Sequence, residues 1–182
     1  ARLEANGLTD RTVVVCTADH GEELGDHGGL GHGHALWSEL VRTPLVMAGP
    51  GVPVGETRVG AVSNRFLAPT LARIGGTSLP GVPGALDLLE NAPPGEAWFT
   101  TSKGKWGDAR YQELQGLRRG PYTVHWRVTA ARPDEAARAD LRIFDVLAHP
   151  EQSDDLMSVR EAEARELAVD IDGLRAVAAE LR

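Results

Sequence analysis

The sequence is poor in cysteine, long apolar runs, basic clusters and aromatic residues, and each shortage bears on which classes of protein or site are possible. It has one cysteine, Cys16, so a disulfide within the chain is excluded and the redox compartment stays open. No apolar run reaches the length of a membrane-spanning helix, and no signal peptide is visible. Lysine and arginine form no dense block and the formal net charge is −7, which argues against nucleic acid as a partner. Only 5% of the residues are aromatic, which gives no sign of a carbohydrate-stacking groove.

The remaining composition is typical of a folded globular protein. Of the 182 residues, 42% are hydrophobic and 25% are charged, enough for one domain with a core or for a core with a small satellite. The chain opens on "ARLEANGLTDRTVVV" without an initiator methionine, as if in the last turns of a helix closed by Gly7. We therefore expect it to be a piece of a longer protein.

Strand and helix patterns alternate in the first half of the chain. Residues 12–17 are a continuous β-branched and apolar run, which predicts a strand buried on both faces of a parallel sheet. Residues 43–49 predict a second buried strand, stopped by a Pro-Gly pair. Helical spacing predicts a short helix over residues 35–41 and a longer one within residues 64–74, ended by two glycines.

The second half favours an antiparallel sheet. Short strand candidates separated by turn signals cover residues 97–102, 114–119, 122–129 and 141–147. Ser158 and Glu161 have the spacing of a capping box that would begin a helix. That helix is predicted to pack on the small sheet through an apolar stripe formed by Leu167, Ile171, Leu174, Ala178 and Leu181. We expect an α/β fold in two parts, residues 1–90 and residues 91–182.

Carboxylate and imidazole groups gather where the first strand should end, in "TADHGEELGDHGGLGHGH". Asp19 and His20 offer a hard oxygen and an imidazole nitrogen, a donor pair that suits Mn, Zn or Fe and tolerates Ca or Mg. Both can reach one ion only if the strand has broken, which Gly21 permits. A Gly-rich loop over residues 21–33 follows, and this part of the chain carries three more histidines, His27, His32 and His34. Ligands of open α/β sheets bind at this end of the strands, so we expect the site here.

Each of these features also has an ordinary structural explanation. Asp19 can cap a turn, the histidine loop can be adventitious, and the neighbouring acidic side chains can form a solvated rim of Glu22, Glu23 and Asp26. Taken together, they favour a functional site. Two histidines outside the loop are interpreted differently: His125 as a strand side chain and His149 as a turn residue.

The segment "TVVVCTADHGEELGDHGGLGHGHALWSELVRTPLVMAGPG" closely resembles sulfatases and their relatives in the alkaline phosphatase superfamily. In that family a strand ends in Ser-Asp-His-Gly or Ser-Asp-Asn-Gly, followed by a Gly-rich loop. The stretches "VSNRFLAPTLARIGG", "GLRRGPYTVHW" and "RIFDVLAHPEQSDDL" are similar to later family motifs, in the right order. The resemblance implies part of an alkaline-phosphatase-like α/β/α sandwich, followed by a small antiparallel sheet packed by a C-terminal helix.

The resemblance also implies roles for particular residues. Asp19 and His20 would be metal ligands for a divalent ion, Ca or Mn, and the histidine in place of the family's frequent asparagine favours Mn. His32 would be catalytic and contact the sulfate or phosphate oxygens, with His34 as a second, less well matched, substrate-binding residue. Glu22 and Arg42 would support the site, either by contacting the residues that bind the metal and the substrate or by forming a structural ion pair.

The chain lacks the motif that carries the family's nucleophile. Nothing in it matches the Cys-x-Pro-Ser-Arg type motif whose Cys or Ser becomes the formylglycine nucleophile. Cys16 has no such sequel, and its place in a buried strand predicts an inert core residue. The resemblance places that nucleophile in a missing N-terminal half, so this chain alone is predicted to be inactive.

Three functions remain open from the sequence. The favoured one is the C-terminal part of a metal-dependent sulfatase-type hydrolase that cleaves sulfate esters. The second is a phosphodiester or phosphonate monoester hydrolase of the same superfamily, and the third is a non-catalytic binding module. In the first two cases the partner is a small-molecule sulfate or phosphate ester. A homo-oligomer stays open, and so does the compartment, bacterial cytoplasm or periplasm.

Overall fold

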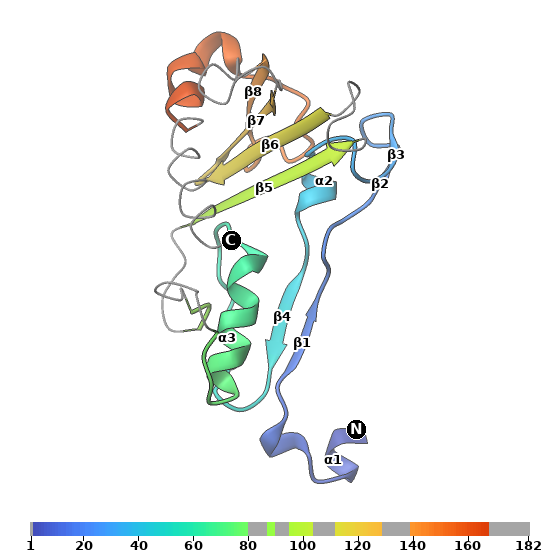
Figure 1. Ribbon diagram of the computed structural model, residues 1–182, viewed down its shortest axis with the longest axis vertical. Coiled ribbons are helices and arrows are strands. Elements are labelled where there is room, and N and C mark those ends of the chain that lie inside the picture. The colour runs from blue at the N-terminus through green and yellow to red at the C-terminus, as the bar shows by residue number, and fades with distance from the viewer. Residues whose placement is uncertain (1, 80–86, 90–94, 104–111, 129–138, 168–182) are drawn as a thin grey trace.

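The computed structural model describes residues 2–79, 87–89, 95–103, 112–128 and 139–167. Figure 1 shows a pair of strands with nearby helices at one end and a four-stranded sheet at the other. Within the described residues, no helix is both long and apolar enough to cross a membrane.

The chain begins with α1 (Arg2–Ala5) and the 3-10 helix η1 (Thr9–Arg11). Gly7 ends the first turns with a φ of +62°, a left-handed conformation that a residue with a side chain adopts at a cost. The predicted helix stub closed by this glycine is therefore confirmed.

The strands β1 (Val14–Thr17) and β4 (Leu45–Ala48) pair with each other in antiparallel register. The predicted parallel pairing and burial on both faces are wrong for these strands, because Val14 is 49% exposed and Val46 is 61% exposed. The interpretation of Cys16 as an inert core residue is wrong for the same reason, since it is exposed on β1. In the described part of the chain, this apolar pair has no further strand beside it.

Between these strands lie a small hairpin, β2 (Glu23–Leu24) with β3 (Leu30–Gly31), and the helix α2 (Ser38–Val41). After β4 come η2 (Asn64–Phe66) and α3 (Leu67–Ile74), which ends at the two glycines. The two helices predicted within residues 35–41 and 64–74 are thus confirmed.

The C-terminal sheet has four antiparallel strands in sequence order. They are β5 (Glu96–Lys103), β6 (Gln112–Arg119), β7 (Tyr122–Val128) and β8 (Ala139–Asp145). All four predicted strands are therefore present. His125 lies on β7 and His149 in the turn segment after β8, as the sequence predicts.

One face of this sheet holds a compact hydrophobic core. It consists of Leu117, Val124, Trp126 and Ile143, with Ala164 from the helical residues 157–167. Leu167, the first member of the predicted apolar stripe, packs against this core, and Ile171, Leu174, Ala178 and Leu181 lie outside the described residues.

The start of this helix differs from the capping box expected at Ser158. The carboxylate of Asp155 accepts hydrogen bonds from the backbone N–H of Met157 (3.1 Å) and of Ile143 (3.3 Å). Ser158 already lies inside the helix. Asp155 therefore caps the helix and also ties it to β8.

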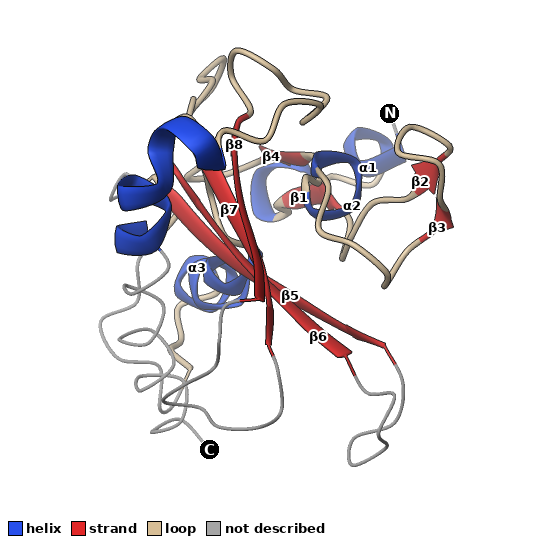
Figure 2. Cartoon of the chain, turned by 90° about the horizontal axis from the view of Figure 1, so that it is seen from above, coloured by secondary structure: helices blue, strands red, loops and turns tan. Residues whose placement is uncertain are grey.

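The opposite face of the sheet is turned toward α2 and the hairpin β2–β3, as Figure 2 shows. Because side chains alternate along a strand, His125 and Phe144 point away from the core that Val124 and Ile143 form. The His125 ring lies 5.4 Å from the Phe144 ring and 5.8 Å from the Trp37 ring, centroid to centroid. Trp37, directly before α2, thus joins the two parts of the chain.

Burial, aided by the nearby Arg142 guanidinium, lowers the pKa of His125 to about 3. Between pH 6.5 and pH 3, His125 therefore binds a proton in the unfolded chain but not in the folded chain.

The free energy of unfolding should fall by about 1.4 kcal/mol for each unit of falling pH in this window. Urea unfolding at pH 6.5 and 5.0 measures the slope. We expect His125→Phe to remove this part of the decline and His149→Gln, which alters an exposed histidine, to retain it; an equal decline in the His125→Phe variant would contradict the assignment.

Candidate functional site

Asp19 and His20 follow the end of β1, where the strand has given way to a loop. Nε2 of His20 lies 3.8 Å from Oδ2 of Asp19. Nδ1 of His20 donates to the Gly21 carbonyl oxygen (2.9 Å), which leaves the lone pair on Nε2 and so presents the form of the ring that binds metals. The His20 backbone N–H donates to Asp19 and lowers the pKa of that carboxyl, which favours its ionised form.

His32 returns to the same place from the end of the hairpin. Its ring centroid is 4.1 Å from that of His20, and its Nδ1 donates to Oε1 of Glu22 (2.5 Å). One ligand atom from each of His20, Glu22 and His32 falls within 4.8 Å of the others. All three side chains are exposed, and His32 and His34 line an open cavity of about 340 Å³.

Gly21 is required at the start of this loop by lack of space. Its N–H donates to the Leu40 carbonyl oxygen (2.8 Å), and a Cβ on Gly21 would overlap the Glu39 carbonyl group. Its φ is not left-handed, so a close approach to α2, rather than an unusual backbone conformation, explains the glycine.

Glu23 is the buried anchor of the loop, with 1% of its surface exposed. Oε1 accepts from the N–H groups of His27 (3.1 Å) and Gly29 (2.6 Å), and Oε2 accepts from Nε2 of His34 (2.7 Å). The bond from His34, followed by the two backbone bonds, lowers the pKa of Glu23. A solvated rim is therefore wrong for Glu23, although Glu22 and Asp26 are exposed.

His27 connects the loop to the far end of the sequence. Its Nδ1 donates to Oε1 of Glu39 (2.6 Å), and its Nε2 donates to the Glu151 carbonyl oxygen (2.7 Å). The ring also stacks on Trp37 at 4.2 Å and 9°. Both ring nitrogens therefore face oxygen atoms, one in α2 and one in the segment after β8. The sequence marks His27 only as one of several loop histidines, because its partner at residue 151 cannot be read from local pattern.

Arg42 stands apart from this cluster. It is exposed at the C-terminal end of α2, and it makes no ion pair within the residues that the structure describes. The structural ion pair that the resemblance suggested for it is not formed there.

A family model of sulfatases matches residues 1–77, the segment that contains β1, the loop, α2, β4 and α3. This match shows that residues 1–77 are similar to sulfatases. The matched segment includes Asp19, His20, Glu22 and His32, so these residues lie within the part of the chain that is similar to sulfatases.

Several curated proteins are similar to this chain. The low-salt glycan biosynthesis sulfotransferase Agl7 of Haloferax volcanii is 41% identical over 96 residues, which cover 50% of this chain and 24% of that protein. Arylsulfatase K of Mus musculus is 32% identical over 102 residues, 54% of this chain and 18% of that protein. The chain therefore matches at most about a quarter of the length of these relatives.

Solved structures are similar to nearly the whole length of this chain. BT4656, solved with its substrate D-glucosamine-2-N,6-O-disulfate, has a TM-score of 0.74 and 21% identity, over 96% of this chain and 36% of that one. The phosphonate monoester hydrolase of Agrobacterium radiobacter has a TM-score of 0.70 and 22% identity, over 99% of this chain and 37% of that one. At these identities the likeness shows the fold alone, which is the predicted alkaline-phosphatase-like α/β fold.

Sulfatases generally depend on a metal ion, and the donor set at the end of β1 fits one. Asp19 supplies a carboxylate oxygen and His20 a free imidazole nitrogen, with the Glu22 carboxylate close by. A second group, Glu23, His27 and Glu39, also has its atoms close together. Their polar atoms are already joined by the loop's own hydrogen bonds, so the second group fits a structural role.

Proposed function

We propose that this chain forms part of the active site of a metal-dependent sulfatase-type hydrolase that cleaves sulfate esters. The observation that carries the proposal is the convergence of His20, Glu22 and His32, with Asp19 beside His20, at the end of β1 and inside the segment matched by the sulfatase model. Four polar side chains at one exposed point have little use in packing. They are well suited to holding a cation and an anionic group next to each other.

Asp19 and His20 are the proposed ligands of a divalent ion, Ca or Mn. When bound, such an ion polarises the sulfuryl oxygens and lowers the pKa of an attacking hydroxyl. The carboxylate of Asp19 stays ionised because a backbone N–H donates to it. Gly21 holds His20 through Nδ1 and directs Nε2 toward Asp19, so these residues orient the donors in advance.

His32 is the proposed catalytic residue. Glu22 accepts the hydrogen on Nδ1, which fixes the ring and leaves Nε2 for the sulfate ester. A ring that carries a second proton, on Nε2, can donate it to a sulfuryl oxygen and pass it to the leaving oxygen, after which Nε2 keeps the lone pair. His34 is proposed as a second substrate-binding residue, held in place by Glu23. Arg42 makes no contact that would support the site, and we assign it no step.

The nucleophile of this reaction is proposed to lie outside these 182 residues. No Cys-x-Pro-Ser-Arg type motif occurs in the sequence, and Cys16 lies on β1 without it. A formylglycine and the remaining carboxylates would have to come from elsewhere in a longer protein. On this proposal the 182-residue chain alone is inactive.

A second candidate is transfer of the sulfuryl group to an acceptor hydroxyl. It is favoured by the 41% identity to a protein named as a sulfotransferase. The same donor set serves both reactions, since they differ in whether water or an alcohol accepts the group. The alternative of a phosphonate monoester hydrolase has support from fold likeness only.

Kinetics with matched substrates test this proposal. The full-length protein that contains this chain should hydrolyse an aryl sulfate at least about a hundredfold faster than the matching phosphodiester or phosphonate monoester, in kcat/KM. The 182-residue chain should show no turnover. A reversed preference would favour the phosphonate reaction, and product formation that requires an added alcohol would favour the transferase. A full-length protein inactive on all of these would favour the binding module.

A further inference from the structure

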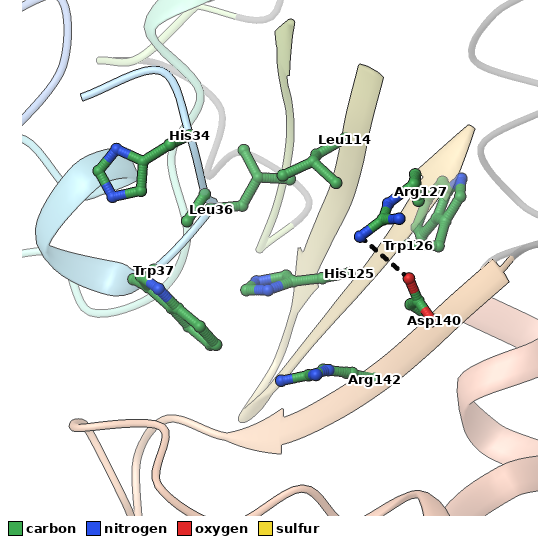
Figure 3. Close-up of a pocket in the computed structure, with 10 residues that line it drawn as sticks. His34, Leu36, Trp37, Leu114, His125, Trp126, Arg127, Asp140 and Arg142 are labelled. Atoms are coloured by element: carbon green, nitrogen blue, oxygen red, sulfur yellow. Dashed lines mark ion pairs between the residues drawn. The ribbon is translucent and has the colours of Figure 1, made fainter. Parts of the chain in front are cut away.

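A cavity of about 200 Å³ lies between the segment before α2 and the outer face of the C-terminal sheet. Figure 3 shows Trp37 and Leu36 on one side and His125 and Arg142 on the other, with both of the latter pointing toward Trp37. Residues more than seventy positions apart in the sequence therefore share one cavity. Among the residues that line it, only His34 belongs to the site proposed above.

Among the described residues, one cationic side chain at this cavity has no carboxylate partner. Arg127 pairs with Asp140 at 3.2 Å, so these two charges are matched. Arg142 is exposed and makes no ion pair or side-chain hydrogen bond within the residues that the structure describes. In a chain with a formal net charge of −7, a guanidinium at a cavity that no described carboxylate pairs with favours an anionic ligand.

His125 provides an independent indication that a ligand belongs here. The residue is 9% exposed, and its Nε2 has no hydrogen-bond partner although it is fully enclosed. A buried polar atom without a partner costs free energy, so unpaired groups of this kind are rare and often mark a missing ligand or water. The ring is neutral at physiological pH because burial and Arg142 disfavour its charged form. A neutral imidazole can donate one hydrogen bond to an oxygen of an anion.

The remaining wall is apolar and leads toward the proposed catalytic residues. Leu36 and Leu114 contribute aliphatic surface, and Trp37 contributes an aromatic ring that His27 stacks against. His34 lines this cavity and also the open cavity that contains His32. A ligand whose ester group is held at His32 can therefore extend past His34 into the cavity.

We infer that this cavity is a subsite for a second anionic group, a carboxylate or a second sulfate, carried on the body of the sulfate ester substrate. Arg142 binds the anion, His125 donates to it, and Trp37 and Leu36 pack against the body of the substrate. The inference rests on the proposed function and deepens it, because it names the substrate class as sulfate esters with two negative groups.

Two aryl sulfates that differ only in a ring carboxylate test the subsite: phenyl sulfate and 3-carboxyphenyl sulfate. The full-length protein should favour the carboxylated substrate, mainly through KM. In the Arg142→Ala variant, KM for that substrate should rise ten- to a hundredfold, since the lost bond is charge-assisted, while phenyl sulfate changes less than twofold. Arg165→Ala, which removes an exposed arginine on the helix over the opposite face of the sheet, should change neither value. An equal change for both substrates, or no change, would overturn the subsite.

A binding measurement separates failure of the subsite from failure of the proposed function. Calorimetric titration of the full-length protein with 3-sulfobenzoate, a dianion without an ester bond, needs no turnover. We expect tighter binding than for benzenesulfonate, and at least a tenfold loss in Arg142→Ala. If no sulfate ester is hydrolysed but this difference persists, the proposed reaction is wrong and the anion site stands. If the two anions bind equally, the subsite is wrong whatever the reaction.

Discussion

An Asp19→Ala, His20→Ala double variant of the full-length protein is expected to lose its bound metal and about a thousandfold of its aryl sulfate turnover. The two side chains are the only pair at the end of β1 that offers an ionised oxygen and a free imidazole nitrogen facing each other, within the described residues. Removing both takes away two donors from a site that needs at least four. The metal's stabilisation of charge in the transition state should be lost with it.

Metal content and kcat measured on the same samples check this result. The unchanged protein should contain about one metal per chain, and the double variant close to none. Asp10→Ala removes an exposed carboxylate from η1, away from the cluster, and should leave both values unchanged. A double variant that keeps its metal but loses activity would mean that Asp19 and His20 bind substrate instead. One that keeps both would mean that the histidine loop is not the active site.

The strands of the C-terminal sheet could be predicted from the sequence because their pairing is local. β5 to β8 follow one another in the sheet as in the chain, and each pair is antiparallel. Alternating side chains and turn residues are short-range signals, so a sequence pattern contains nearly all the information that such pairing needs. The helix ended by Gly7 is another case, because one residue with a φ of +62° decides where it ends.

Burial in the first half could not be predicted in the same way. The run at residues 12–17 is apolar enough for a buried strand, yet Val14 and Cys16 are exposed because no described element covers that face. Whether an apolar strand is covered depends on distant parts of a chain, which hydrophobic pattern does not identify. Glu23 is the opposite case, a charged residue in a polar loop that is buried because three donors surround it.

The site residues could be predicted in part, less completely than the strand pairing but better than the burial. The sequence and its family resemblance point to Asp19, His20, Glu22 and His32. Of these, His20, Glu22 and His32 meet in space, and Asp19 lies beside His20. The contact from His27 to the Glu151 carbonyl spans 124 positions and has no local signature. The Ser38 N–H similarly donates to the Gln152 side chain at 2.6 Å. Both contacts tie the loop and α2 to the segment that follows β8, so the second half of the chain helps to position the site.

Glu23→Ala is expected to lower turnover by the full-length protein about a hundredfold, although Glu23 is not among the proposed metal or sulfate contacts. The change leaves the N–H groups of His27 and Gly29 and the Nε2–H of His34 without their acceptor. A loop without this anchor should hold His32 and His34 in several positions, and small displacements of catalytic groups are costly. The melting temperature should fall by several degrees for the same reason.

Two further variants should show how much of the loss in turnover comes from the Glu23 side chain. Glu23→Gln keeps an oxygen for the backbone donors and should lose about tenfold, while Asp26→Asn on the same loop is exposed and should lose nothing. Because its partners lower the pKa of Glu23, the stabilisation it gives is present above its ordinary pKa and declines as pH falls below it. Thermal unfolding of the unchanged protein and of Glu23→Gln at pH 7 and pH 4 should therefore show a smaller difference at pH 4. A difference that grows with acidity would mean that Glu23 is held in its protonated form, and the anchoring role would then belong to a neutral hydrogen bond.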